Sequence, residues 1–128
     1  MNEMIKAKKI LVLGGPGSGK SVLSANLSRQ MSIPAYHLDE IHLKYDETSN
    51  GKKHRNNDIL KILKTDYWIL DGNYRSTLAE RTKECDVIFL LDYSFLQLIT
   101  SVFVRSIKQY FQHKKHVYDI KMFDLKIA

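Results

Sequence analysis

The hydrophobic residues of this chain are concentrated in four short runs, which comprise residues 9–13, 35–38, 67–70 and 86–91. None of the runs alternates apolar with polar positions, so each has the pattern of a β-strand that is covered on both faces. The segments between them contain apolar residues at helical spacing. Strands that alternate with helices in this way predict an α/β fold, in which helices cover both faces of a parallel sheet.

The helix after the first run is the clearest of the predicted helices. Its apolar stripe consists of Val22, Leu23, Leu27 and Met31, with Ser24, Ser28 and Arg29 opposite. Pro34 ends it, because proline disfavours helical geometry in the residue before it. We also expect short helices over residues 58–64 and 77–83 and a longer one over 94–113. Residues 44–57 are polar and contain the turn signal Asn50-Gly51, so they predict a mobile surface segment.

Length, charge and cysteine content narrow the class of protein. A chain of 128 residues predicts a single domain. The net charge of +6 suits a polyanionic ligand, although a modest lysine excess also serves solubility. Cys85 is the only cysteine, which excludes an intrachain disulfide and favours a cytoplasmic localisation. The apolar stretch 95–111 is interrupted by Arg105 and Lys108, so we do not expect it to span a membrane.

The loop after the first predicted strand carries the clearest chemical signal. It matches the pattern G-x-x-x-x-G-K-[ST] and consists of Gly14, Gly15, Pro16, Gly17, Ser18, Gly19, Lys20 and Ser21. Glycines let successive backbone N–H groups converge on an anion, and the following helix points its positive end at the same place. Lys20 would lie beside the β and γ phosphates, and the Ser21 hydroxyl would ligate Mg²⁺. The loop predicts binding of a nucleoside triphosphate.

The other three predicted strands each end in an aspartate, namely Asp39, Asp71 and Asp92. Ligands of open α/β sheets bind at the carboxyl ends of the strands. Asp71 would support Mg²⁺ or its water, and Asp39 would bind a substrate hydroxyl or an outer water of the metal. Asp92 is equally compatible with a structural role in its loop.

Two arginines and two histidines lie close to these aspartates in the sequence. Arg75 follows Asp71 on the same rim, where its planar fork would suit phosphate, the alternative being a solvated charge. Arg81 is also compatible with a solvent-facing position. His37 and His42 lack partners at metal-ligand spacing, so we interpret them as ordinary polar side chains.

The order of these segments resembles the adenylate-kinase-like branch of P-loop kinases, and in particular the bacterial DNA topology modulation (FlaR-type) proteins. The similar segments are residues 10–21, 33–39, 68–74 and 87–92. The element Asp71-Gly-Asn-Tyr74 is the most distinctive of them. The resemblance implies a three-layer α/β/α P-loop fold, with a parallel sheet of about four strands in the order 2-3-1-4.

The same resemblance extends to individual residues. It implies that Arg75 contacts phosphate and that Arg81 is the family's arginine after the Asp-Gly-Asn-Tyr element. Arg105 is the best-placed cation for the helix that usually carries several arginines. The chain departs from the pattern at its end, so we expect no fifth strand, and residues 113–128 would form a short lid or a disordered tail.

We therefore predict a protein that binds ATP and Mg²⁺ and resembles nucleoside and nucleotide kinases, with Lys20, Asp71, Arg75, Arg81 and Arg105 serving phosphoryl transfer to an unknown small acceptor. Asp39, Arg75 and Arg81 would face that acceptor. The alternative is a nucleotide-dependent regulator, or a DNA-associated protein, with little or no turnover. The sequence has no helix-turn-helix or zinc signature, and residues 113–116 form only a weak basic patch.

Overall fold

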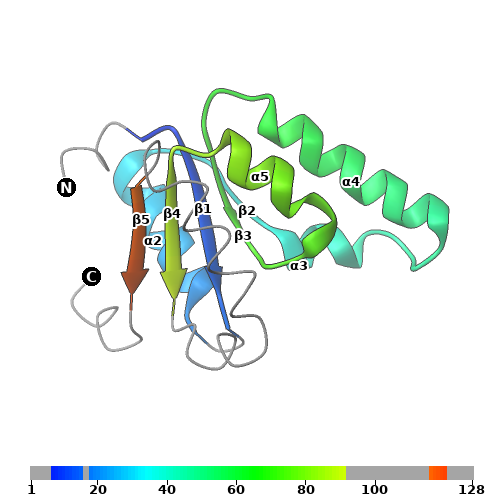
Figure 1. The fold of residues 1–128 in the computed structure, drawn as a ribbon, viewed down its shortest axis with the longest axis horizontal. Coiled ribbons are helices and arrows are strands. Elements are labelled where there is room, and N and C mark those ends of the chain that lie inside the picture. Colours follow the sequence, from blue (N-terminus) through cyan, green and yellow to red (C-terminus); the bar gives the residue numbers. More distant parts are fainter. Residues whose placement is uncertain (1–6, 16–17, 92–115, 121–128) are drawn as a thin grey trace.

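The centre of the molecule is a sheet of parallel strands. The computed structural model describes residues 7–15, 18–91 and 116–120. Within these, the strands are β1 (Lys9–Gly14), β2 (Ala35–His37), β3 (Trp68–Asp71), β4 (Val87–Leu91) and β5 (His116–Ile120). Their order is β2-β3-β1-β4-β5, and every neighbouring pair is parallel (Figure 1). The predicted α/β class and the order 2-3-1-4 are confirmed.

The fifth strand corrects the expectation that the sheet stops at four. Strand β5 pairs along β4 from Val87 opposite His116 to Leu91 opposite Ile120. The sequence of this strand mixes polar with apolar residues and so lacks the continuous apolar run that identified the central strands. A strand at the edge of a sheet has only one neighbour and does not require such a run. Residues 113–115 and 121–128 lie outside the described part of the chain.

Helices cover the two faces of the sheet. The helices are α2 (Lys20–Met31), α3 (Leu38–Leu43), α4 (Ser49–Leu63) and α5 (Leu78–Glu84), and the 3₁₀ turn η1 (Arg75–Thr77) precedes α5. Figure 1 shows α2 behind the strands, with α3, α4 and α5 grouped on the other side. The predicted helix over 77–83 is confirmed. The helix predicted over 94–113 lies outside the described residues.

Alternate residues of the strands divide the interior into two cores. On the α2 side, Ile10, Val12 and Ile69 pack with Leu23 and Leu27. On the opposite side lie Leu11, Leu13, Trp68, Leu70 and Ile88, which pack against the residues of α3, α4 and α5. Because side chains alternate along a strand, odd and even positions serve different helices. This alternation explains why the central strands are apolar at every position.

The buried face of helix α2 differs from the predicted apolar stripe at two residues. Val22, assigned to the apolar stripe, is 60% exposed, whereas Ser24, assigned to the polar face, is fully buried. The serine hydroxyl lies within hydrogen-bonding distance of backbone carbonyls of its own helix and of the Asp71 carboxylate, which satisfy its polar group. The polar contact with Asp71, rather than hydrophobicity, decides which side of the helix faces the sheet at this position.

Residues 44–57, predicted to be a mobile surface segment, contain the first part of helix α4. It begins at Ser49, and the hydroxyl of the N-cap residue Thr48 accepts a hydrogen bond from Gly51 N at 3.1 Å. Gly51 therefore lies in the first turn of a helix and not in a turn after Asn50. A Cβ at Gly51 would collide with the Asp46 carbonyl, so the glycine permits a close approach here. The cap and this close packing replace the missing apolar residues as determinants of the helix start.

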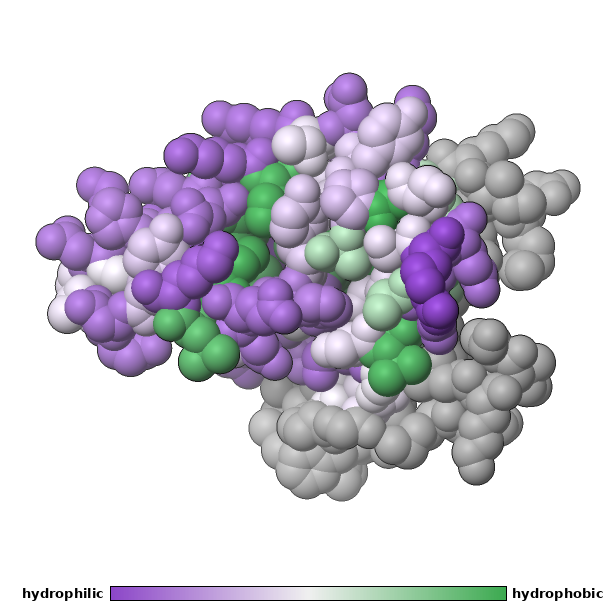
Figure 2. Space-filling view, turned by 180° about the vertical axis from the view of Figure 1, so that it is seen from behind, coloured by the Kyte–Doolittle hydropathy of each residue, from purple (hydrophilic) through white to green (hydrophobic). Residues whose placement is uncertain are grey.

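The surface around α4 is mainly hydrophilic (Figure 2). Its exposed positions include Lys52, Lys53, His54 and Lys61, whereas Ile59 and Leu63 are buried. Among the described residues, no helix is both long enough and apolar enough to span a bilayer.

Candidate functional site

The glycine-rich loop leaves the sheet at the carboxyl end of β1 and leads into α2. Gly15 O accepts a hydrogen bond from Ser18 N at 3.1 Å. Gly19 has a φ of 93°, a left-handed conformation that glycine adopts readily, and it caps α2 without a side chain. The first turn of α2 contains no acidic residue. Its N–H groups and positive dipole end are therefore available to an anion. Pro16 and Gly17 lie outside the described residues.

Two features inside the loop fit a bound phosphate group. The Ser18 hydroxyl is buried and has no hydrogen-bond partner among the described residues, and such a group normally has one. A Cβ on Gly14 would lie 2.6 Å from both Leu91 O and the Ser18 hydroxyl, so the loop can take this path only with glycine there. The loop thus combines close backbone packing with an unsatisfied polar atom.

Lys20 lies over the loop and contacts its backbone. The Nζ ammonium donates to Gly14 O at 3.0 Å and to Gly15 O at 3.2 Å. These bonds hold the ammonium beside the loop. That Lys20 lies beside bound phosphates stays a prediction. The adjacent Ser21 is exposed at the start of α2.

Asn73 joins the loop to the segment after β3, a contact that the sequence did not reveal. Its Oδ1 accepts a hydrogen bond from Gly14 N at 3.1 Å, and its Nδ2 donates to Gly14 O at 2.6 Å. The side-chain amide therefore pairs with both polar groups of one glycine, as a neighbouring strand would. This pairing fastens the last residue of β1 to the segment that follows β3.

Asp71 is the last residue of β3 and is 4% exposed. It is aligned with Val12 of β1 and with His37 of β2. Its Oδ2 contacts the Ser24 hydroxyl and His37 Nδ1. The side chain of His37 is 25% exposed and belongs to the site, whereas the sequence suggested an ordinary polar residue. The available signal was its position at the end of a strand, on the same edge as Asp71.

Asp39 lies in the first turn of α3, whereas the sequence predicted it at the end of the second strand. Its exposed carboxylate accepts a hydrogen bond from the Tyr74 hydroxyl at 2.6 Å, and this bond raises the pKa of Tyr74 to about 12. The ring of His42 stacks on Tyr74 with centroids 3.4 Å apart. Burial lowers the pKa of His42, and the nearby charge of Arg55 adds to the effect. Asp39, His42 and Tyr74 thus form one contacting group.

Arg81 and Arg75 have different surroundings. Arg81 is fully buried, and its guanidinium donates to Gly72 O at 2.7 Å, to Thr77 Oγ1 at 3.1 Å and to Tyr74 O. The predicted solvent-facing alternative for Arg81 is therefore wrong, and its contacts shape the segment after Asp71. Arg75 begins η1 and is exposed on the rim. Asp92 and Arg105 lie outside the described residues.

A further buried arginine, Arg55 of α4, was not singled out in the sequence. It is 4% exposed, and its Nη1 donates to Asp46 O at 3.1 Å, with Glu47 Oε1 at 3.5 Å. These contacts fasten α4 to the segment that precedes it. Because they join residues on both sides of the helix start, no local pattern predicts them.

The side chains at this site supply too few ligands to bind a metal ion by themselves, but they suit a metal ion that arrives bound to a phosphate ligand. Among the described residues, no group of three or more histidine, cysteine or carboxylate side chains could hold a metal. The Ser21 hydroxyl and the Asp71 carboxylate are hard oxygen groups that suit Mg²⁺. Phosphate oxygens and water would supply the other ligands, as Mg²⁺ commonly requires.

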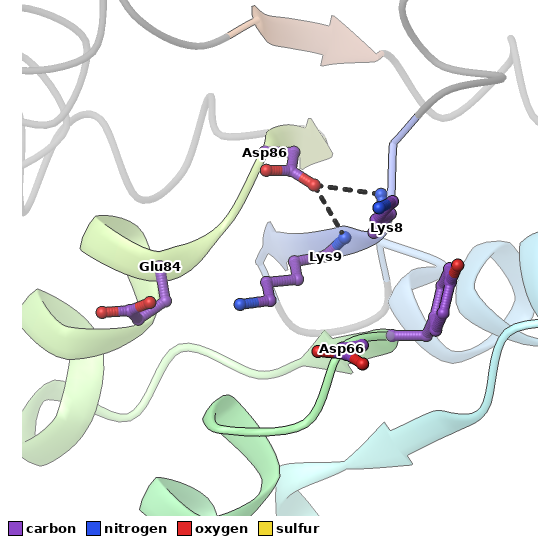
Figure 3. A pocket seen from close by; sticks show the side chains of 6 residues that line it. Lys8, Lys9, Asp66, Glu84 and Asp86 are labelled. Atoms are coloured by element: carbon purple, nitrogen blue, oxygen red, sulfur yellow. Dashed lines mark hydrogen bonds between the residues drawn. The ribbon is translucent and has the colours of Figure 1, made fainter.

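A hollow lies at the end of the sheet where the strands begin (Figure 3). It is lined by Lys8, Lys9, Asp66, Tyr67, Glu84 and Asp86 and has a volume of about 390 Å³. Asp86 accepts hydrogen bonds from the backbone N–H groups of Lys8 and Lys9 at 3.0 and 3.1 Å, and Lys8 Nζ lies 5.8 Å from the Tyr67 ring centre. Asp86 thus pairs with the backbone at the amino end of β1, whereas the glycine-rich loop follows its carboxyl end.

Comparison with solved structures identifies the class of fold. A gluconokinase from Sinorhizobium meliloti 1021 is similar with a TM-score of 0.51 and 14% identity, over 90% of this chain and 82% of that one. A shikimate kinase from Bacteroides thetaiotaomicron is similar with a TM-score of 0.51 and 14% identity, over 88% of this chain and 86% of that one. No protein-family model and no curated protein matches the sequence. The chain has the α/β fold of P-loop kinases.

Proposed function

We propose that this protein binds ATP with Mg²⁺ and transfers the γ-phosphoryl group to a small hydroxyl-bearing acceptor. The observation that carries the proposal is the arrangement at the carboxyl edge of the sheet. There, Lys20 and an uncapped helix start lie in the glycine-rich loop, and the Asp71 carboxylate lies at the end of the next strand. The structural similarity to two small-molecule kinases supports it.

Each residue has a defined part in this proposal. The loop N–H groups and Lys20 bind the phosphates, while Ser21 and Asp71 hold the metal, which would neutralise charge on the β and γ phosphates. The acceptor oxygen bonds to the γ phosphorus, the bond from that phosphorus to the β–γ bridging oxygen breaks, and ADP leaves. The acceptor proton passes to water or to a carboxylate. The chain contributes positioning and charge rather than a covalent intermediate.

The acceptor side is formed by the group around Asp39. Its carboxylate is exposed and would accept a hydrogen bond from an acceptor hydroxyl in place of Tyr74. Arg75 on the rim would contact phosphate, and Arg105 would add positive charge during transfer. Arg81 would reach a phosphate only by leaving three buried acceptors. We therefore give Arg81 the part of shaping the segment from Gly72 to Tyr74.

Thermal unfolding with and without nucleotide tests the binding step. We expect ATP with Mg²⁺ to raise the melting temperature of the wild type, because a ligand of the folded state stabilises it. Lys20→Ala should abolish this rise and still fold. Lys53→Ala, an exposed lysine on α4, serves as the charge-matched control and should keep the rise. Equal shifts in the wild type and in Lys20→Ala would refute the assignment.

A screen with radiolabelled ATP tests the transfer step. Nucleosides, nucleotides and hydroxy acids would be offered separately, and label in one of them would identify the acceptor class. The resemblance to DNA topology modulation proteins motivates one further arm with double-stranded DNA. Binding of ATP without label transfer to any small molecule would favour the alternative of a nucleotide-dependent regulator with little turnover.

A further inference from the structure

The relation between His37 and Asp71 extends the proposed function to a residue that the loop motif does not include. His37 ends β2 and Asp71 ends β3, and the two are direct partners in the parallel register. Ile69 and Ala35, two positions earlier in each strand, pack in the core on the α2 side. Since side chains alternate along strands, His37 and Asp71 also face α2. There Asp71 meets Ser24 of α2.

Both hydrogen-bonding contacts of the Asp71 side chain are made by the same oxygen. Ser24 Oγ and His37 Nδ1 contact Oδ2, and among the described residues no hydrogen bond engages Oδ1. The Asp71 side chain is 5% exposed. The carboxylate is thus held through one oxygen, and the other makes no hydrogen bond to the described residues.

Ser24 alone cannot hold this orientation. Its hydroxyl carries one proton, which is shared among three acceptors, namely Lys20 O at 2.8 Å, Ser21 O at 3.4 Å and Asp71 Oδ2. An ionised carboxylate only accepts hydrogen bonds, so Nδ1 of His37 must carry the proton in the contact with Asp71. His37 therefore provides a donor that is directed at Asp71 alone among the described residues.

We propose that His37 is a positioning residue that orients Asp71 so that its free oxygen meets nucleotide-bound Mg²⁺. This inference rests on the proposed function and deepens it. A carboxylate on a metal or on a metal-bound water must keep its direction, and partners behind such ligands commonly change metal affinity by about 10–100-fold. His37 would act on the metal-dependent part of nucleotide binding and not on the contacts of the loop with the phosphates.

Calorimetric titration of ATP in excess Mg²⁺ and in EDTA tests the inference without relying on turnover. The quantity compared is the ratio of the two dissociation constants, and thermal unfolding checks that each variant is folded. We expect His37→Leu to lower the advantage given by Mg²⁺ about tenfold while metal-free ATP binds within about twofold of the wild type. The deletion of a donor should leave the loop contacts intact.

A matched pair of variants separates positioning from packing. His37→Asn places an amide donor near the position of Nδ1 and should restore most of the Mg²⁺ advantage. His37→Gln places its donor near Nε2 and should behave like His37→Leu. If the leucine variant does not fold, the glutamine variant tests the same expectation. An unchanged ratio in the Gln variant, or equal losses with Mg²⁺ and with EDTA, would overturn the inference. Failure of the wild type to bind ATP would instead refute the proposed function.

Discussion

Asn73 and Gly14 exchange two hydrogen bonds at the start of the glycine-rich loop, one in each direction. The Gly14 carbonyl also accepts a bond from Lys20, so two donors share one oxygen. If Lys20 moves to a bound phosphate, Asn73 is the donor that keeps this carbonyl paired. The segment after β3 thus stabilises the loop in the state in which the lysine has left it.

Asn73→Ala should therefore weaken nucleotide binding more than it weakens the fold. An unpaired buried polar group costs about 1–3 kcal/mol, which corresponds to a loss of ATP affinity of about 5–150-fold. Asn73→Asp keeps an acceptor for Gly14 N but loses the donor and adds a negative charge, so it should bind ATP more weakly still. Calorimetry with Asn57→Ala, an exposed residue of α4, as the control would measure both effects. Unchanged affinity in both Asn73 variants would contradict the role of the pair.

Replacement of Arg81 should affect the fold before it affects the ligand. Arg81→Lys keeps the charge but cannot reach three acceptors with a planar fork. We expect a loss of at least about 2 kcal/mol in the free energy of unfolding, because buried acceptors are left without donors. Urea denaturation measures this loss, with Arg29→Lys on the exposed end of α2 as the control. A stable Arg81→Lys variant with impaired ATP binding would indicate a phosphate contact instead.

Gly51→Ala should be destabilising although alanine is the better helix former. In an open helix interior this change stabilises by about 1 kcal/mol. Here the added Cβ would collide with the Asp46 carbonyl and carboxylate and push apart the contacts that begin α4. Asn50→Ala, at the exposed neighbouring position, should be neutral or stabilising. If both substitutions raised the melting temperature, the close approach of Gly51 to Asp46 would be absent.

His42 should make the protein sensitive to acid. Burial lowers its pKa in the folded state, so the unfolded chain binds the proton more readily. Neutral His42 makes its full contribution to the free energy of unfolding above the ordinary histidine pKa of 6.5. This contribution is lost as the pH falls through the lowered pKa of His42 in the folded state. Denaturation series across this window should show a smaller decline for His42→Gln than for the wild type. Parallel curves would place the acid sensitivity elsewhere.

The sequence predicted most of the sheet because its strands are covered on both sides. Residues such as Leu11, Leu70 and Ile88 are fully buried, and a continuous apolar run is the direct consequence. The fifth strand has one neighbour and no such run, so it was missed. Helix α3 has only six residues, too few for a period to be recognised. The start of α4 depends on Thr48 and Gly51, residues that are equally typical of turns.

The sequence predicted only those parts of the candidate site that lie within one continuous segment of the chain. The loop from Gly14 to Ser21 is a continuous motif, and Asp71 ends a clear strand. The partners of these residues come from distant parts of the chain, such as Asn73 on Gly14 and His37 on Asp71. The burial of Arg81 depends likewise on carbonyls of a folded loop. No spacing rule joins such residues, because the fold alone brings them together.

The central place of β1 has a consequence for how the chain assembles. This first strand pairs with β3, residue 9 opposite residue 68, and with β4, residue 10 opposite residue 87. During synthesis, β1 and its glycine-rich loop must wait for β3 and then for β4 before both neighbouring strands are present. Long-range pairing of this kind slows folding and prolongs the exposure of apolar strands. The glycine-rich loop at the end of β1 thus has strands on both sides only after residues 87–91 have been made.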